Sequence, residues 1–170
     1  MNNDAFTYRL ELPNDSAVVE ALHIEVFGPG RFARAAYRLR EGIPHDPMLS
    51  FVAQADKDLI ASVRLTPIVI GDRPALLLGP LVVAPSVKGQ GAGKNLVRIA
   101  VKAAREADHK LVMLVGDEDY YRSLGFHRLD AYAILLPAPV DPERVLVACL
   151  VDGALDGLHG SVTRAAKATK

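Results

Sequence analysis

Hydrophobic positions along the chain change their spacing several times, and each change predicts a different element. Residues 6–12 alternate apolar and polar side chains with a period of two, which is typical of a half-buried strand, and Pro13 ends it. Apolar residues then recur every three or four positions, which predicts a helix that starts at residues 14–16 and carries Val18, Ala21, Leu22 and Val26. After Gly28-Pro29-Gly30, a second helix is expected over about 31–41.

The rest of the chain alternates between strand and helix patterns. In order, we expect strands at about 49–56, 59–70 and 75–83, a helix at 91–107, a strand at 110–115, a short helix at 117–125, and strands at 130–136 and 144–151. The first two of these strands are expected to form a hairpin through Lys57-Asp58. This order predicts an α/β (α+β) domain over residues 1–155, followed by a Gly-rich and then basic C-terminal tail, 156–170, that we expect to fray.

Composition narrows the classes of partner. Half of the 170 residues are hydrophobic, which is enough for one buried core. The 20 basic residues balance the 20 acidic ones, so we expect no basic surface that would recruit nucleic acid or a membrane. Cys149 is the single cysteine, and its apolar surroundings, VLVACLV, predict a buried side chain. A chain with one cysteine and no disulfide is expected in the reducing cytoplasm. The five histidines lack the spacing of metal ligands, so no metal is expected. No secretion signal or membrane-spanning run is recognisable, and the oligomeric state, including a homodimer, is left open.

The sequence LVVAPSVKGQGAGKNL, residues 81–96, carries the strongest chemical signal. An apolar strand ends at Pro85, and Gly89, Gly91 and Gly93 lead into a helix. Glycines there let backbone N–H groups approach an anion, and the helix dipole favours negative charge at that end. The segment therefore predicts a phosphate site, against the alternative of a glycine-rich surface turn without a ligand.

Spacing separates three kinds of phosphate loop. A Walker A loop would need glycine where Lys88 stands and a hydroxyl where Asn95 stands. A dinucleotide loop needs Gly-x-Gly-x-x-Gly, whereas the glycines here run Gly-x-Gly-x-Gly. The segment resembles the third kind, the pyrophosphate loop of the GNAT acetyltransferases, Arg/Gln-x-x-Gly-x-Gly/Ala after a strand ending in Val-x-Pro. Lys88 takes the place of the family's Arg or Gln and keeps a donor with a different geometry.

A second motif follows one strand later. Residues 120–126, YYRSLGF, resemble the GNAT pattern Phe-Tyr-x-x-x-Gly-Phe, and LVGDEDYYRSLGF together with LSFVA and EVFGPGRF is similar to the YhbS-like branch of predicted bacterial acetyltransferases. The family's usual Asn before this helix is missing, because Leu114 stands seven residues before Tyr121. The resemblance implies a GNAT fold, a mixed sheet of about seven strands with helices on both faces, splayed at the acetyl-CoA site.

The resemblance also assigns roles to residues. It implies acetyl-CoA as the donor and direct attack of a primary amine on the thioester. It implies that the splayed strand and the loop hold the cofactor through Leu81, Val82, Val83, Lys88, Gly89, Gln90, Gly91, Ala92 and Gly93. A freed N–H of Val82 or Val83 is expected to stabilise the developing oxyanion. Tyr121 is the expected general acid for the departing thiolate, the alternative being an aromatic ring packed under the sheet, and Tyr120 takes the family's Phe position and its packing role.

Other polar residues are weaker candidates. His23 and Glu25 on the first helix and Asp117 beside the cofactor are candidate bases, but the favoured explanation is a solvated helix face for His23 and Glu25 and an N-cap for Asp117. The arginines at 31, 34 and 38 are expected on a solvated helix face, with contact to the acceptor or to CoA as the alternative. Arg64 points either to solvent or into the acceptor cleft.

The sequence thus favours an N-acetyltransferase for a small-molecule or amino-acid-like amine. Two alternatives remain open: a non-catalytic acyl-CoA-binding module, and acetylation of a protein N-terminus or an aminoacyl-tRNA. The zero net charge weighs against tRNA.

Overall fold

The computed structural model describes residues 5–30, 35–129 and 133–165. Its strands are β1 (Thr7–Leu10), β2 (Phe51–Ala55), β3 (Asp58–Ile70), β4 (Arg73–Val83), β5 (Leu111–Val115), β6 (His127–Arg128), β7 (Ile134–Leu135), β8 (Val145–Cys149) and β9 (Gly160–Arg164). Its α-helices are α1 (Ser16–Phe27), α2 (Ala35–Arg40), α3 (Ala92–Glu106) and α4 (Glu118–Tyr121), with 3-10 turns at Pro13–Asp15, Pro85–Val87, Arg122–Leu124 and Pro142–Arg144. No helix in these ranges is long and apolar enough to span a membrane.

The strands form one mixed sheet in the order β1-β2-β3-β4-β5-β8-β6, with β7 and β9 off this path. Neighbours are antiparallel except β4 with β5 and β7 with β9, which are parallel. The expected hairpin is present, because Ala55 pairs with Asp58. The predicted mixed sheet with helices on both faces is confirmed.

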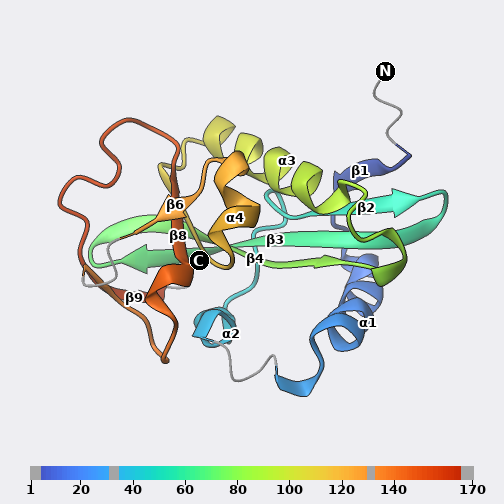
Figure 1. Ribbon diagram of the computed structural model, residues 1–170, viewed down its shortest axis with the longest axis horizontal. Coiled ribbons are helices and arrows are strands. Elements are labelled where there is room, and N and C mark those ends of the chain that lie inside the picture. The colour runs from blue at the N-terminus through green and yellow to red at the C-terminus, as the bar shows by residue number, and fades with distance from the viewer. Residues whose placement is uncertain (1–4, 31–34, 130–132, 166–170) are drawn as a thin grey trace.

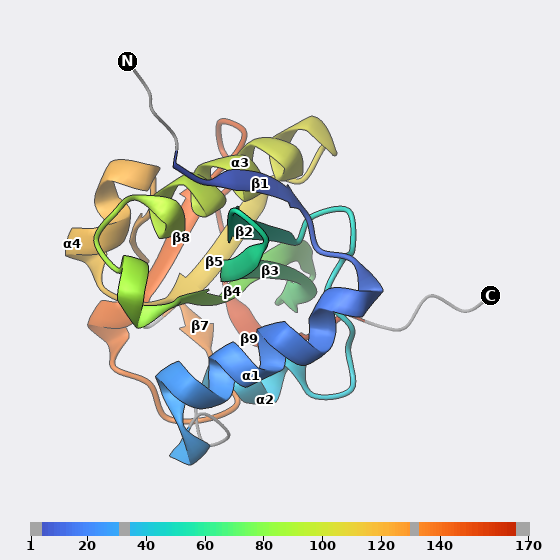
Figure 2. The same cartoon turned by 90° about the vertical axis from the view of Figure 1, so that its right-hand side faces the viewer.

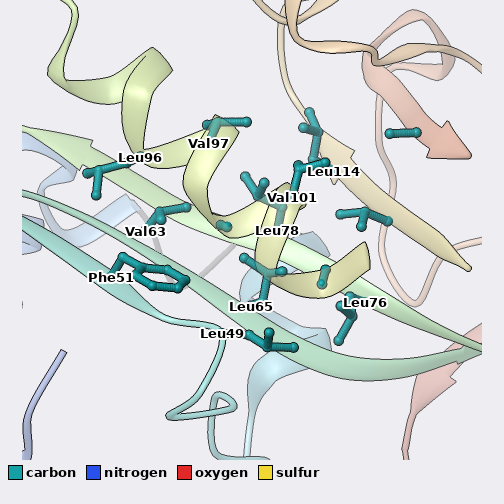
Figure 3. Close-up of a cluster of buried hydrophobic side chains, with 14 of the residues drawn as sticks. Leu49, Phe51, Val63, Leu65, Leu76, Leu78, Leu96, Val97, Val101 and Leu114 are labelled. Carbon is teal, nitrogen blue, oxygen red and sulfur yellow. The ribbon is translucent and has the colours of Figure 1, made fainter. Parts of the chain in front are cut away.

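The sheet separates two layers of helix (Figures 1 and 2). Each face of the sheet has its own apolar core. Alternate residues of β4 point to opposite faces, so Leu76 and Leu78 join the cluster under α3, while Ala75 and Leu77 join the cluster that includes Leu39 of α2. Figure 3 shows the α3 side, where Leu96, Val97 and Val101 lie against strand residues such as Val63 and Leu65. The two cores hold the long strands β3 and β4 rigidly between the layers.

The first helix forms where expected, and only part of its apolar surface is buried. Val19 and Leu22 pack inward, whereas Val18 and Val26 are 49% and 39% exposed. The helix carries apolar residues around most of its circumference, so the periodicity of its sequence does not show which face is buried. Its contact with β3 and β4 decides which face that is. Part of the second expected helix, residues 31–34, and part of the strand expected at 130–136 lie outside the described residues.

Two expectations near the C-terminus are wrong. Residues 160–164 of the tail do not fray but form β9, which pairs with Ile68 to Ile70 of β3 and buries Val162. The reason is that β2 covers only the first half of β3 and leaves the edge of its last residues to β9. Cys149, at the end of β8, is exposed rather than buried, and an apolar run does not show which of its members face outward.

Candidate functional site

The site begins where β4 and β5 part. Their register pairs are Leu76 with Val112 and Leu77 with Met113, and no pair is formed further along β4 among the described residues. On its other side β4 stays paired with β3 as far as Val83. The second half of β4 therefore presents one backbone edge that β5 does not cover, as the resemblance implied.

The direction of the backbone groups tells which residues face that edge. The N–H of Ala84 donates to the carbonyl of Ile60 at 2.7 Å, on the β3 side. Because backbone groups alternate in direction along an antiparallel pair, the N–H and C=O of Val82 also face β3, and those of Leu81 and Val83 face the uncovered edge. Val82 is 1% exposed as well. Of the three predicted strand contacts, Leu81 and Val83 are thus placed to bond a ligand, and Val82 is not.

The glycine loop lies at the start of α3, as the sequence predicted. Gly89 and Gly91 have φ of 81° and 94°, a region that favours glycine, and a Cβ added to either would meet no atom within 4 Å. Gly91 is the N-cap, so the N–H groups of Ala92 and Gly93 belong to the first turn and have no acceptor within the helix. Lys88 is exposed beside them. These groups can hold an anion by backbone donors, the helix dipole and one cation.

Gly93 plays a different part from the other two glycines. It is buried, and a Cβ there would lie 2.7 Å from the Tyr120 hydroxyl and 3.1 Å from Cγ2 of Val83. The Lys94 ammonium lies 5.4 Å from the centre of the Tyr120 ring. Tyr120 therefore bridges the first turn of α3 and the short helix α4, and its hydroxyl reaches the predicted phosphate loop.

Tyr121 is packed on three sides. Its ring meets Phe126 and Tyr120 edge-on, with ring centres 5.8 and 4.8 Å away. A Cβ on Gly116 would lie 2.7 Å from its Cε2 atom, so only glycine leaves room for the ring. Burial, and then the neighbouring Tyr120 and Asp117, raise the pKa of Tyr121 well above its usual value near 10. The phenol therefore keeps its proton throughout the neutral range.

A cleft of about 800 Å³ joins these elements to the N-terminal helices. One wall carries Tyr120 and Tyr121 of α4 with Val115, Gly116 and Asp117, and the β4 segment from Leu78 to Leu81 reaches the same space. The other wall carries His23 of α1, Arg40 of α2, His45 and Arg64. Of the predicted site residues, Leu81 and Tyr121 line this cleft, and the loop 88–93 lies outside it at the start of α3.

A buried ion pair anchors the second wall. Arg64 donates from Nε and Nη2 to the two carboxylate oxygens of Glu11, at 2.9 and 2.5 Å, and the Glu11 side chain is 1% exposed. The Nε2 atom of His45 lies 3.9 Å from Glu11 Oε2. Burial and the Arg64 charge lower the pKa of His45, against the opposing effect of Glu11. Arg64 therefore lines the cleft and has a buried carboxylate partner, and its side chain does not simply extend into solvent.

The weaker candidates separate clearly. His23 is 4% exposed and lines the cleft, so it is not on a solvated helix face, whereas Glu25 and Arg38 are exposed and do not line it. Arg31 and Arg34 lie outside the described residues. Asp117 is the N-cap residue of α4 but makes no side-chain cap, and it lies 3.8 Å from Arg144 Nη2 instead.

Sequence reasoning missed Glu11, and it placed no cleft role on His45, Arg40 or Arg144. Glu11 lies in a strand pattern at a position expected to be polar and exposed. The only sequence signal was the charge of Arg64 in an otherwise apolar strand, which calls for a buried partner without identifying it.

Comparisons with known proteins agree with this geometry. The family model described as Acetyltransferase (GNAT) family matches residues 17–131. The uncharacterized N-acetyltransferase YhbS of Escherichia coli K12 is 27% identical over 159 residues, which cover 91% of this chain and 93% of the relative.

Two solved structures are similar over most of the chain. Escherichia coli YhbS in complex with CoA superposes with a TM-score of 0.80 at 26% identity, over 94% of this chain and 89% of that one. A GNAT family acetyltransferase from Brucella melitensis in complex with acetyl-CoA gives a TM-score of 0.58 at 28% identity, over 89% and 98%. The similarity thus extends beyond the matched segment to both ends of the fold.

Proposed function

The chain belongs to the GNAT acetyltransferase family, and from that premise we propose that it acetylates the primary amine of a small-molecule or amino-acid-like substrate. As a member of the family it is an acetyl-CoA-dependent N-acetyltransferase. The observation that carries the narrower proposal is the cleft of about 800 Å³, which is lined by Leu81 of β4 and Tyr121 together with His23 and Arg64. A space of this size suits a small acceptor.

The chain has groups that fit acetyl-CoA. Two phosphates match the first-turn N–H groups of α3, the glycines before them and Lys88. The uncovered N–H and C=O groups of Leu81 and Val83 match the amides of a pantetheine arm, and Gln90 lies in the same loop with its side chain exposed. Acetyl-CoA supplies a thioester carbonyl carbon for the amine to attack.

Two groups of the chain act on that reaction. The N–H groups of Leu81 and Val83 are directed to the uncovered edge, and that of Leu81, which lines the cleft, donates to the carbonyl oxygen as negative charge develops on it. Tyr121 holds its proton at neutral pH and gives it to the sulfur as the carbon–sulfur bond breaks, and it regains a proton from the newly acylated nitrogen. Fixing amine and thioester side by side in the cleft contributes on the order of 7–11 kcal/mol.

The experiment is release of free CoA thiol from acetyl-CoA in the presence of a panel of primary amines. We expect turnover with at least one amine, and Tyr121→Phe should lower it by roughly ten- to a thousandfold while acetyl-CoA affinity is kept. Tyr8→Phe is the matched control, because it removes a hydroxyl from a ring on β1 that does not line the cleft. Equal losses in the two variants, or an unchanged rate in Tyr121→Phe, would remove Tyr121 from the mechanism.

Tight acetyl-CoA binding without thiol release for any amine would instead favour a non-catalytic binding module.

A further inference from the structure

The imidazole of His23 has an unsatisfied nitrogen in the wall of the cleft. The residue is 4% exposed, and its Nε2 atom is buried without a hydrogen-bond partner among the residues that the structure describes. Buried polar atoms are nearly always paired, since leaving one unpaired costs free energy. His23 also lines the cleft. A ligand in the cleft is therefore the group best placed to supply the missing partner.

The other nitrogen of the ring faces a carboxylate. Nδ1 of His23 lies 3.5 Å from Oε2 of Glu20, one helical turn earlier on α1. A carboxylate beside Nδ1 favours the tautomer that carries its proton there, which leaves the lone pair on Nε2. The Phe27 ring lies tilted against the imidazole, with ring centres 5.9 Å apart, and restricts its rotation.

Three charged groups from three elements face His23: Glu20 on α1, Arg64 on β3 and Arg40 on α2. Burial and the Arg64 charge lower the pKa of His23, Arg40 acts in the same direction, and Glu20 opposes them. The direction of the shift keeps the imidazole neutral at pH 7. A neutral imidazole whose Nε2 has no partner, in a residue that lines the cleft, has the properties of a general base.

We propose that His23 is the base that accepts the proton of the acceptor's ammonium group at Nε2. This inference rests on the proposed N-acetyltransferase function. A primary amine arrives mostly protonated at neutral pH and cannot attack until one N–H bond breaks. His23 takes that proton and releases it to solvent after turnover. The freed electron pair then forms the carbon–nitrogen bond, and the nitrogen's second proton balances the one that Tyr121 gives to the sulfur.

The other candidate bases are less well placed. Glu25 does not line the cleft, and Asp117 is exposed beside Arg144. His45 lines the cleft, but its side chain is 27% exposed and its Nε2 atom lies 3.9 Å from Glu11 Oε2, so unlike His23 it has no buried nitrogen without a partner.

The test is the pH dependence of kcat/KM for His23→Gln, measured with the fastest acceptor of the amine panel. Below the pKa of that amine we expect a loss of about a hundredfold or more. The loss should shrink to a few-fold near pH 10, where the amine is already deprotonated. His127→Gln, which changes an exposed histidine on β6, is the matched control and should keep the wild-type profile. Melting temperature and CoA affinity check that the variant is folded.

A loss that is equal at every pH would show a structural role and overturn the inference, as would an unchanged profile. Either result would leave the proposed function standing, because the wild type still turns over; no turnover by the wild type refutes that function instead. Should His23→Gln fail to fold, nitrogen-15 NMR of the wild-type histidines decides. Protonation of neutral His23 at Nδ1 supports the inference, and protonation at Nε2 overturns it.

Discussion

Replacing Gly116 by alanine tests how closely the general acid is positioned. Gly116 follows β5 and is buried, and its N–H donates to the carbonyl of Arg144 at 2.9 Å. An added Cβ would lie 2.7 Å from Cε2 and 3.2 Å from Cδ2 of Tyr121, and 3.1 Å from Cδ1 of Leu114. Ordinary contacts begin near 3.4 Å, so the ring would have to retreat by roughly 0.7 Å.

The retreat has two measurable consequences. Phe126 is fully buried behind the ring, so overpacking should destabilise the fold by about 1–3 kcal/mol, seen as a melting temperature lower by about 2–4 °C per kcal/mol. The hydroxyl moves with the ring, and a displacement approaching 1 Å can lower turnover by as much as about a hundredfold. The assays are thermal melting and amine-dependent thiol release at saturating acetyl-CoA.

Two comparisons isolate the effect on the ring. Gly30→Ala is the matched control, since a Cβ there meets no atom within 4 Å. If Gly116 acts through the Tyr121 hydroxyl, then Gly116→Ala should cost little further activity in the Tyr121→Phe background. Wild-type turnover in Gly116→Ala, or fully additive losses in the double variant, would refute the reasoning.

Three further predictions follow from the same contacts. Lys88→Ala should weaken CoA binding by about fivefold in calorimetry, as expected of one exposed ion pair. Lys102→Ala, which removes another exposed lysine further along α3, is the control and should leave the affinity unchanged. Equal CoA affinities of Lys88→Ala and the wild type would mean that the backbone alone holds the phosphates. Glu11→Gln should lower the free energy of unfolding in urea by about 3–5 kcal/mol, because Arg64 loses its buried partner, and a change below about 1 kcal/mol would contradict this. Because burial raises the pKa of Tyr121, kcat should not fall between pH 8 and about 9.5, and a fall there that is absent in Tyr121→Phe would disprove it.

Local patterns were enough to predict most of the framework. The glycine loop and the amphipathic spacing of α3 place a helix start after a buried strand, and the structure has both. Gly89 and Gly91 adopt the positive φ values that such a loop requires. These features depend on a few neighbouring residues, so the sequence contains the whole argument for them.

The cleft wall that carries His23 and Arg64 depends on contacts between distant parts of the chain. Glu11 meets Arg64 across 53 residues, and no spacing rule connects them. His23 was expected on a solvated face, because the nearly all-round apolar character of α1 leaves its buried side undetermined. Only the packing of α1 on β3 and β4 turns that residue inward. The direction of the Val82 backbone groups depends on distant residues in the same way, since register with β3 decides it.

A crystal structure of the protein with CoA tests the central claim most directly, because the loop and the general acid lie at the two ends of one predicted path. We expect phosphate oxygens within about 2.7–3.2 Å of the first-turn N–H groups of α3, and the sulfur in the cleft beside the Tyr121 hydroxyl. A pyrophosphate bound away from residues 88–93, or a sulfur directed away from Tyr121, would contradict the account.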